Sequence, residues 1–500
     1  MQINSLTNSL YLVKPEIVVT IVLVCIITFN LIFKDKPQAL PWLSVIGLMI
    51  TSYFVVEQFS YNSFAFASTD YKGLLVTDPF GAFFKILIVL SSVIVILFSI
   101  SNKELDSAAD RLGEYYSLIF GMILGMFFMV SAADLILIYL SVELLSLSSY
   151  VLAGFTKNTL RNSEASLKYV IYGGVSSGIM LFGISIVYGL TGTTNLYEIN
   201  SLIQAPQINQ ITLLFAGILI FTGIGFKISV APFHFWTPDV YEGAPVTITA
   251  YLSVASKAAG FALLIRFIKV TFIKSINAEG YWQVINVIDW KSFFILISII
   301  TMTLGNFAAL WQNNMKRLLA YSSIAHAGYI MLGLVVMSNE GILAIIIYFT
   351  VYAIMNLGAF FIVMLIANKI GSEELDDYKG LGYSTPVLGI SLAIFLISLT
   401  GLPPTAGFIA KLYLFIALVD AKMIGVAIIA LLNTVVSLYY YIRVLKNMYL
   451  DKPGKEIPKF SASIPNLVLL IALVAPIIFF GIYFSPVVNL AKSSLTLFGF

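Results

Sequence analysis

The sequence has few of the side chains that bind metals or form disulfides. Cys25 is the only cysteine among 500 residues, and there are two histidines. A single cysteine excludes an intramolecular disulfide, a zinc site built from cysteines and an iron–sulfur cluster held by this chain alone. We therefore expect no metal site and no bound cofactor on this chain, so that any redox chemistry would require a partner protein.

Charged side chains are also scarce. They make up 11% of the residues, against about 25% in globular proteins. Hydrophobic residues make up 59%, and the mean hydropathy is +0.96. The net charge of +3 is small and the lysines are scattered, which gives no reason to expect a nucleic-acid partner. The composition instead predicts an integral membrane protein that is surrounded by the lipid bilayer.

Apolar runs of spanning length recur along the whole sequence, bounded by proline, glycine, asparagine or charged residues. The runs are continuous, whereas the strands of a membrane β-barrel would alternate in polarity. The first run is too long for the core of a signal peptide, so we expect it to be retained. At about 20 residues per span, the sequence predicts an all-α polytopic membrane protein with about 14 transmembrane helices. The predicted spans are 16–33, 40–59, 80–101, 115–131, 133–155, 164–190, 210–231, 245–270, 292–311, 319–337, 342–367, 386–418, 422–449 and 464–485.

Lysine and arginine are concentrated in the loops after odd-numbered spans, as at Lys34, Arg111, Arg161 and Arg317. Positively charged loops stay on the cytoplasmic side of a membrane. We therefore expect these loops to be cytoplasmic and both termini to lie on the other side.

Prolines interrupt two of the predicted spans, Pro232 in the seventh and Pro403 with Pro404 in the twelfth. A proline inside a span frees backbone carbonyls, which a membrane protein tolerates only against protein or water. Interrupted spans at matching places in two halves of a sequence indicate a transporter built from inverted repeats.

The spacing of ionisable residues supports such a repeat. Glu143 and His326 are 183 residues apart, and Lys227 and Lys411 are 184 apart. Spans 4–8 are then expected to repeat as spans 9–13, and the second copy is inverted because five is an odd number. This divides the chain into 1–114 with three helices, a first repeat at 115–273, a second repeat at 292–449, and 464–500 with the last helix.

Several ionisable side chains lie inside predicted spans, where each costs about 2.5–3.5 kcal/mol on insertion scales and is a functional candidate by default. We expect functional roles for Glu143, Lys227, Lys257, Lys411 and His326. A structural ion pair is the competing interpretation of each charge, and a satisfied core side chain is the competing interpretation of the histidine.

Other candidates are less clear. Lys168 follows Glu164 by one helical turn, which fits a surface pair as well as a functional site. His234 would either cap freed carbonyls or pass protons to the surface, and both interpretations stay open. We expect Arg266 and Lys269 to reach the membrane surface by snorkelling, and we expect Lys85 to be structural.

The chemistry that suits these side chains is proton relay. Burial lowers the pKa of a lysine, and a nearby carboxylate raises it again. Lysine changes its pKa readily, unlike arginine. Making or breaking a pair between Glu143 and Lys227 would therefore switch the lysine between holding and releasing a proton.

Three segments carry a resemblance to a known family: KISVAPFHFWTPDVYEGAP at 227–245, KRLLAYSSIAH at 316–326 and GLPPTAGFIAK at 401–411. Together they resemble the antiporter-like membrane subunits of respiratory complex I, and the N subunits most closely, over roughly residues 70–485. The M subunits have glutamate where this chain has Lys411. Relatives often carry a second proline within 244–247, which this chain lacks.

The resemblance implies a fourteen-helix fold with two inverted five-helix repeats in a bacterial inner membrane. It also implies a complex that passes electrons from NADH through FMN and iron–sulfur centres to quinone, all held by other subunits. The partners would be other membrane subunits, including neighbouring antiporter-like ones, and the species moved would be protons. The family's proton-path residues, where the motifs match, are Glu143, Lys168, Lys227, Lys257, His326 and Lys411.

Two alternatives remain at this point. Subunits of multisubunit sodium/proton antiporters share the core of this family, and such a protein would have no electron-transfer partner. A purely structural membrane scaffold, in which the buried charges serve only as pairs, is the other alternative.

Overall fold

The structure is a computed structural model that describes residues 3–68, 71–157, 160–206, 208–285, 289–452 and 461–499. Within these ranges, thirteen helices are long and apolar enough to cross a membrane. The predicted twelfth span consists of two shorter helices, α17 (Pro386–Thr400) and α18 (Ala406–Asp420). The predicted all-α, multi-pass fold is therefore confirmed, including the interruption of the twelfth span.

The long helices follow the predicted spans closely. One of them, the predicted eighth span, is continuous but contains a π-helical turn between α11 and α12, at Leu252–Ser256. The helices are α2 (Lys14–Ile32), α3 (Leu40–Glu57), α4 (Pro79–Ser99), α5 (Leu112–Ser131), α6 (Leu135–Ala153), α7 (Leu160–Thr191), α9 (Gln210–Ile228), α11 (Val246–Tyr251), α12 (Lys257–Phe272), α13 (Trp290–Ala309), α14 (Met315–Val335), α15 (Asn339–Ile370), α17 (Pro386–Thr400), α18 (Ala406–Asp420), α19 (Ile424–Tyr449) and α20 (Ile464–Ile482).

Short elements in the connections were not predicted, because they are too short to give a spanning signal. Two of them are antiparallel hairpins, in which β1 pairs with β2 and β3 pairs with β4. The short elements are α1 (Ile3–Leu12), α8 (Leu196–Leu202), α10 (Trp236–Gly243), α16 (Leu381–Ser384), α21 (Ser485–Ser493), β1 (Ser63–Ala65), β2 (Leu75–Thr77), β3 (Ile273–Ile276), β4 (Trp282–Val284) and 3-10 turns at Pro37–Ala39, Gln58–Ser60, Lys103–Arg111 and Leu375–Tyr378.

Many of the helices begin at a side chain that accepts hydrogen bonds from the first turn. Asp134 accepts from the N–H groups of Ile136 (2.8 Å) and Leu137 (3.2 Å) at the start of α6. Such a cap satisfies amides that have no partner within the helix. The capping residues are Asp78, Asp134, Asn195, Asn209, Asp289, Asn314 and Ser338.

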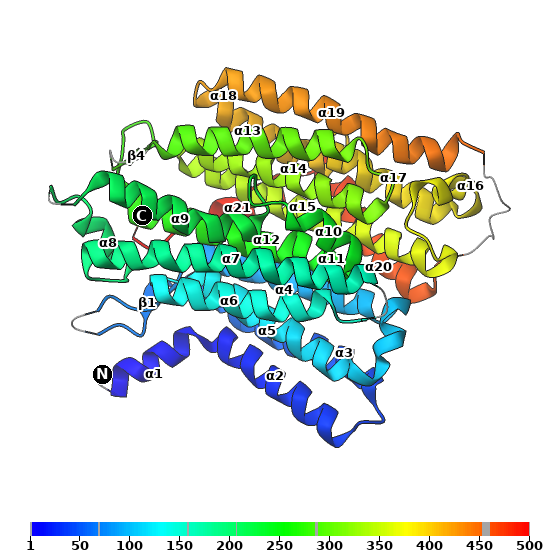
Figure 1. Cartoon of the computed structure of the whole chain (residues 1–500), viewed down its shortest axis with the longest axis horizontal. Coiled ribbons are helices and arrows are strands. Elements are labelled where there is room, and N and C mark those ends of the chain that lie inside the picture. Colours follow the sequence, from blue (N-terminus) through cyan, green and yellow to red (C-terminus); the bar gives the residue numbers. More distant parts are fainter. Residues whose placement is uncertain are drawn as a thin grey trace.

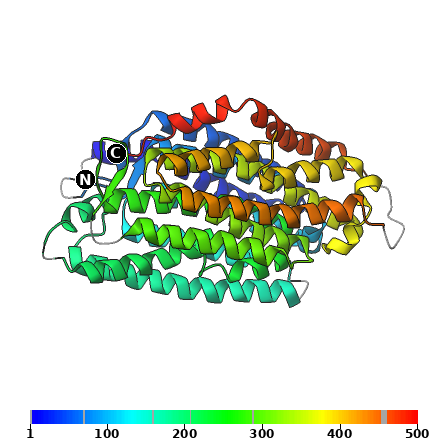
Figure 2. The same ribbon diagram turned by 90° about the horizontal axis from the view of Figure 1, so that it is seen from above.

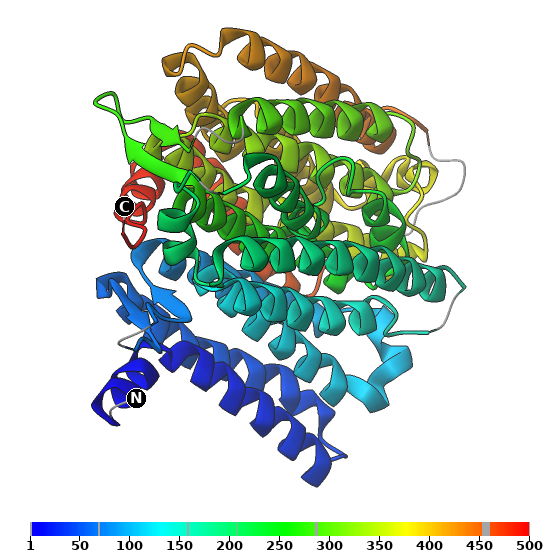
Figure 3. The same cartoon turned by 60° about the vertical axis from the view of Figure 1, so that its left-hand side comes forward.

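The long helices run roughly side by side, with α2 at one edge of the bundle and α19 at the opposite edge (Figures 1 and 3). Both chain ends lie at the same end of the bundle, and α16 lies at the other end (Figure 1). Viewed from above, α20 and α21, coloured red, follow one flank (Figure 2). This arrangement gives the protein two ends, on which the connecting segments are gathered.

The centre of the bundle is formed by α12, α14 and α15. Every residue from Val246 to Phe272 is buried. Arg266 and Lys269 on α12 are therefore fully covered, and the expectation that they snorkel is wrong. Both terminal nitrogens of Arg266 donate hydrogen bonds to the Asp78 carboxylate (2.8 and 2.9 Å). The Lys269 ammonium donates to the side-chain oxygen of Asn339 (3.1 Å). The sequence separation of these partners explains why the pairing was not predicted.

Two sets of five spanning helices have the same order and nearly the same spacing. Helices α5, α6, α7, α9 and α11 begin at residues 112, 135, 160, 210 and 246. Helices α13, α14, α15, α17 and α19 begin at residues 290, 315, 339, 386 and 424. The first four helices of each set pack in the same way, α5 on α6 and α7 on α9, then α13 on α14 and α15 on α17.

Each set also contains an equivalent hydrogen bond, which joins the start of its second helix to the segment after its third helix. The N–H of Leu135 at the start of α6 donates to the carbonyl of Thr194, just after α7 (2.8 Å). The N–H of Met315 at the start of α14 donates to the carbonyl of Glu373, just after α15 (2.8 Å). The two junctions lie at opposite ends of the bundle, beside α8 and α16 respectively (Figure 1).

Candidate functional site

The first break separates α9 from α10. Helix α9 ends at Ile228, and Ser229 takes a left-handed conformation (φ 60°). The N–H of Val230 donates to the carbonyl of Gly225 (3.1 Å), the 6→1 bond of a Schellman ending. Pro232 follows, so the helix cannot continue. Trp236, the first residue of α10, donates its indole N–H to the carbonyl of Phe226 (3.0 Å), which also accepts from the N–H of Ser229 (3.2 Å).

The second break separates α17 from α18 and has the same local form. Gly401 is left-handed (φ 87°), and the N–H of Leu402 donates to the carbonyl of Ile397 (3.3 Å). Pro403 and Pro404 then prevent the helix from continuing. Here the freed carbonyl of Thr400 accepts from the Lys411 ammonium (2.7 Å).

Lys227 lies in the last turn of α9, and its ammonium group is buried. The nitrogen has no hydrogen-bond partner among the residues that the structure describes. It lies over the rings of Tyr150, Tyr169 and Phe226, at 5.5, 5.3 and 5.4 Å from their centroids. A cation is attracted to such ring faces at these distances. Lys227 is therefore held by aromatic rings and not by an ion pair.

Glu143 lies at the middle of α6 and is half-buried. Its carboxylate accepts a hydrogen bond from the Ser177 hydroxyl on α7. The pair between Glu143 and Lys227 that was considered from the sequence is thus open in this structure. The carboxylate and the ammonium are both available to other partners.

Lys257 is the first residue of α12, directly after the π-helical turn. Its ammonium donates to both oxygens of Ser323 on α14, the hydroxyl at 2.6 Å and the carbonyl at 2.8 Å. The hydroxyl of Tyr352 on α15 donates to the same serine hydroxyl (3.0 Å). Lys257 is thereby joined to both neighbouring helices of the core.

His326 lies one turn after Ser323 on α14 and is buried among tyrosines. Its Nδ1 shares a hydrogen bond with the hydroxyl of Tyr348 (2.7 Å), and its Nε2 faces the hydroxyl of Tyr441 (3.4 Å). The ring of Tyr352 lies against the imidazole, with 5.1 Å between the ring centroids. Both ring nitrogens of His326 therefore face groups that accept and donate protons.

Lys411 completes the row on the other side of His326. Besides the bond to Thr400, its ammonium lies 3.4 Å from the Thr434 hydroxyl and 4.5 Å from the centre of the Tyr329 ring. The hydroxyls of Tyr329 and Thr434 share a hydrogen bond of 3.0 Å. Tyr329 is one turn from His326 on α14, so Lys257, His326 and Lys411 are connected through the same helix.

Lys168 is placed differently from the other predicted residues. Its side chain is about one-third exposed and forms ion pairs with Glu164 (2.7 Å) and Asp239 (2.5 Å). Asp239 in turn pairs with Arg317 (2.6 Å). The helix pair with Glu164 that the sequence suggested is present, and Asp239 and Arg317 extend it into a charge network at the edge of the protein.

His234 lies in the segment between α9 and α10. The side chain is buried against the ring of Phe235, at 4.5 Å between centroids. Its Nδ1 has no hydrogen-bond partner among the described residues. The carbonyl of Phe226 at this break accepts from the Trp236 indole and the Ser229 N–H, and among these described residues no hydrogen bond from His234 to it is present.

Another carboxylate inside the bundle, besides Glu143, is that of Glu16. Glu16 on α2 lies 2.6 Å from the Lys85 ammonium, which also donates to Gln58 (2.9 Å), and these side chains are buried. This fits the structural role expected for Lys85. Glu16 was overlooked because it stands at the edge of its apolar run. Neutral hydroxyls such as Ser323 and Tyr352 were missed because they carry no charge to mark them in an apolar sequence.

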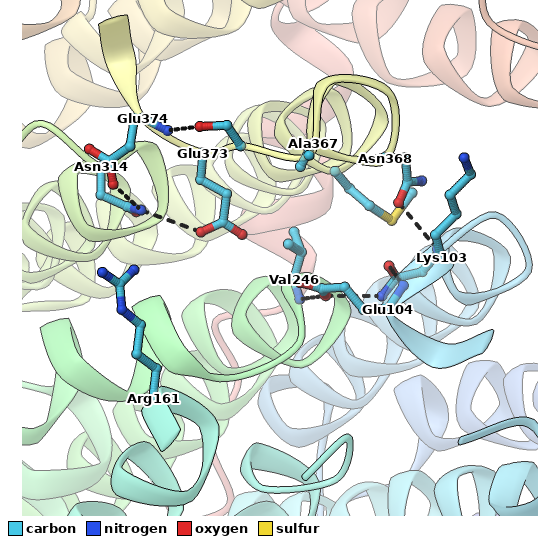
Figure 4. A pocket seen from close by; sticks show the side chains of 13 residues that line it. Lys103, Glu104, Arg161, Val246, Asn314, Ala367, Asn368, Glu373 and Glu374 are labelled. Atoms are coloured by element: carbon cyan, nitrogen blue, oxygen red, sulfur yellow. Dashed lines mark hydrogen bonds between the residues drawn. The ribbon is translucent and has the colours of Figure 1, made fainter. Parts of the chain in front are cut away.

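A cavity of about 550 Å³ opens at the end of the bundle that carries α16 (Figure 4). Glu104, Glu373, Lys103 and Arg161 are among the side chains around it. Lys316 is buried nearby and pairs with Glu373 (2.7 Å). The cavity is thus hydrophilic, whereas the flanks of the bundle are apolar.

The chemistry of the site follows from its donors and acceptors. Amines, an imidazole and hydroxyls in a buried row can exchange protons over short distances. Among the described residues, no three His, Cys, Asp or Glu side chains lie close enough together to hold one metal ion.

Comparison with known proteins places this geometry in a family. The family described as NADH:quinone oxidoreductase/Mrp antiporter, TM matches residues 132–437. NADH-quinone oxidoreductase subunit N 2 of Chloroherpeton thalassium is 47% identical over 491 residues, which cover 97% of this chain and 94% of that protein. The resemblance inferred from the three sequence motifs is therefore confirmed.

Solved structures agree. A chain of respiratory complex I from Thermus thermophilus is similar with a TM-score of 0.77 at 28% identity, covering 95% of this chain and 98% of that one. A chain of the Mrp complex from Dietzia sp. DQ12-45-1b has a TM-score of 0.79 at 18% identity, covering 99% and 97%, and shows the shared fold. This chain belongs to the NADH:quinone oxidoreductase/Mrp antiporter transmembrane family and is a relative of the N subunits of NADH–quinone oxidoreductase.

Proposed function

We propose that this chain is a proton-translocating membrane subunit of an NADH–quinone oxidoreductase. It carries out no redox chemistry itself. Electrons pass from NADH through FMN and iron–sulfur centres to quinone on other subunits, and neighbouring antiporter-like subunits adjoin it in the membrane. The observation that carries the proposal is the buried row of Lys257 on α12, His326 on α14 and Lys411 on α18. Each of the three forms a hydrogen bond with a hydroxyl group of a neighbouring helix, that of Ser323, Tyr348 and Thr434 respectively.

The relay consists of Glu143, Lys227, Lys257, His326 and Lys411. Two charges about 4 Å apart interact by about 4 kcal/mol at an effective dielectric of about 20. Moving one charge against the membrane potential costs about 2.3 kcal/mol per 100 mV. The energy gained or lost when the pair between Glu143 and Lys227 closes or opens is therefore large enough to drive a proton on or off the lysine. Lys168 belongs to this relay as an entry group on the edge, where its ion pairs keep it charged, and His234 is a candidate exit.

The same proposal includes the internal repeat and the orientation. The first repeat covers 115–273 and the second, inverted one covers 292–449, between 1–114 and 464–500. The nearly equal helix spacing and the junctions at opposite ends of the bundle support it. The protein lies in the bacterial inner membrane with both termini on the non-cytoplasmic side, which the distribution of lysine and arginine supports.

The test measures proton uptake and NADH oxidation in inverted membrane vesicles that hold the whole complex. Lys257→Met keeps the length of the side chain and removes the titratable amine, so proton uptake per NADH oxidised should fall. Lys446→Ala, which removes an exposed lysine, is the matched control. Flavin and iron–sulfur proteins should copurify with the chain in mild detergent.

Two results would contradict the proposal. The chain would be an antiporter subunit if its deletion caused sodium sensitivity while NADH oxidation stayed intact. It would be a scaffold if Lys257→Met reduced only the amount of assembled complex and left proton uptake per NADH unchanged.

A further inference from the structure

Ser323 lies where the two five-helix sets meet. Lys257 begins α12, which continues the span that α11 of the first set starts, whereas Ser323 on α14 and Tyr352 on α15 belong to the second set. The Ser323 hydroxyl is within 2.6 Å of the Lys257 ammonium and 3.0 Å of the Tyr352 hydroxyl. All three side chains are buried. This hydroxyl is therefore the direct polar link from the lysine of the first set to the side chains around His326.

Two contacts separate the possible roles of Ser323. Its backbone carbonyl accepts a second N–H of Lys257 at 2.8 Å, so the ammonium stays anchored to α14 without the hydroxyl. The hydroxyl adds something that the carbonyl lacks, because it both accepts and donates a proton. Serine also needs no resting charge for this, which suits a site where charge is costly.

The geometry points to the Ser323 hydroxyl as the group that passes protons between Lys257 and His326, with the Tyr352 hydroxyl as the next carrier. This inference rests on the proposed function, since it names the group that joins the two halves of that relay. It adds two neutral residues, Ser323 and Tyr352, to the ionisable ones.

The proton transfer balances as follows. An N–H bond of the Lys257 ammonium breaks and a new O–H bond forms on Ser323, which leaves a neutral amine. The original proton of Ser323 moves to the Tyr352 oxygen, after the tyrosine hydroxyl has turned its own hydrogen away. The proposal adds one bridging water molecule, which carries the proton that Tyr352 gives up to an imidazole nitrogen of His326, whose ring lies against that of Tyr352 (5.1 Å between centroids). The net change is one proton moved from amine to imidazole, and the reverse sequence returns it.

The experiment uses the whole complex in inverted vesicles and compares hydroxyl deletions in pairs. Ser323→Ala removes the proposed carrier and keeps the carbonyl anchor. Its control is Ser44→Ala, since Ser44 is equally buried and its hydroxyl donates to the carbonyl of Leu40 in its own helix (2.8 Å). Tyr352→Phe is paired with Tyr251→Phe, because the buried Tyr251 hydroxyl bonds to Ser92 on α4 (2.6 Å).

Ser323→Ala and Tyr352→Phe should assemble normally but lower the rate of proton uptake by at least about tenfold, since a positioned proton carrier contributes factors of about 10²–10⁴. Ser323→Thr, which retains the hydroxyl, should restore most of it. The two controls should pump at the normal rate. Pumping by Ser323→Ala at the rate of Ser44→Ala would overturn the inference.

Lys257→Met is measured in parallel to separate the two proposals. If Lys257→Met stops pumping while Ser323→Ala pumps normally, the inference about Ser323 fails and the proposed function stands. If Lys257→Met itself pumps normally, the proposed relay fails.

Discussion

After Ile228 and after Thr400 the chain leaves a helix through a left-handed residue, and each time a carbonyl of the last turn accepts a hydrogen bond from a side chain beyond the break. In the first break that donor is the indole of Trp236, and Lys227 is left over the rings of Tyr150 and Tyr169. In the second break the donor is Lys411 itself. The two lysines also stand on opposite sides of their breaks, Lys227 before and Lys411 after.

The comparison shows that equal sequence spacing does not mean equal environments. The offset of 184 residues suggested that Lys227 and Lys411 are counterparts, but the helix endings at Ser229 and Gly401 are related by a different offset. Lys411 is stabilised by a fixed backbone dipole. Lys227 depends on rings and on whichever group approaches it, which suits a side chain whose partner changes.

The largest expected effect comes from the left-handed residue of each break. A Cβ at Gly401 would lie 2.7 Å from Cδ of Lys411, and φ there is 87°. Gly401→Ala should therefore lower the stability of the complex by about 1–3 kcal/mol and displace Lys411 from Thr400. Thermal denaturation of the purified complex measures the change. Ser229→Ala, at a position that already has a side chain, should change the stability of the complex by less than about 0.5 kcal/mol. Equal changes in stability for Gly401→Ala and Ser229→Ala would contradict this account of the two breaks.

A difference of similar size is expected between the two lysines. Lys411→Met leaves the Thr400 carbonyl without its donor, which costs about 1–3 kcal/mol. Lys227→Met removes an amine that has no hydrogen-bond partner among the described residues, and should leave stability unchanged or raise it, because a buried polar group without a partner is unfavourable. The same denaturation experiment decides between them. A greater loss in Lys227→Met would contradict the contrast.

The smallest effect concerns the cap in the first break. Trp236→Phe keeps an aromatic ring stacked on Tyr169, 4.3 Å away, but removes the hydrogen bond to Phe226. A loss of about 0.5–1.5 kcal/mol follows. Trp311→Phe is the control, since Trp311 is 82% exposed and is expected to leave the denaturation temperature unchanged. No loss in Trp236→Phe would mean that the N–H of Ser229, which also donates to this carbonyl (3.2 Å), satisfies it alone.

The sequence predicted the spans well because continuous hydrophobicity is a strong signal, and the prolines at 232, 403 and 404 marked the interruptions. It also selected Lys227, Lys257, His326 and Lys411, since ionisable groups stand out in apolar helices. It did not predict what binds them. Ser323 and Tyr352 look like ordinary residues of a membrane helix.

The sequence also did not predict ion pairs between residues that are far apart along the chain. Asp78 and Arg266 are 188 residues apart, and periodicity along one helix carries no information about such a partner. Arg266 near the end of a span looked able to reach the surface, but α12 is enclosed on every side. For Lys168, the sequence indicated the local pair with Glu164 one helical turn away, but it did not indicate the pair with the distant Asp239.

The enclosure of α12 separates two kinds of mutational tolerance within one membrane protein. Every side chain from Val246 to Phe272 is buried within the protein, so bilayer thickness and lipid composition should act on Lys257 through the helices around it. A change of side-chain volume in α12 should be felt as in the core of a water-soluble enzyme. In α20, where Val468 and Ile471 face outward, volume should hardly matter and polarity should decide.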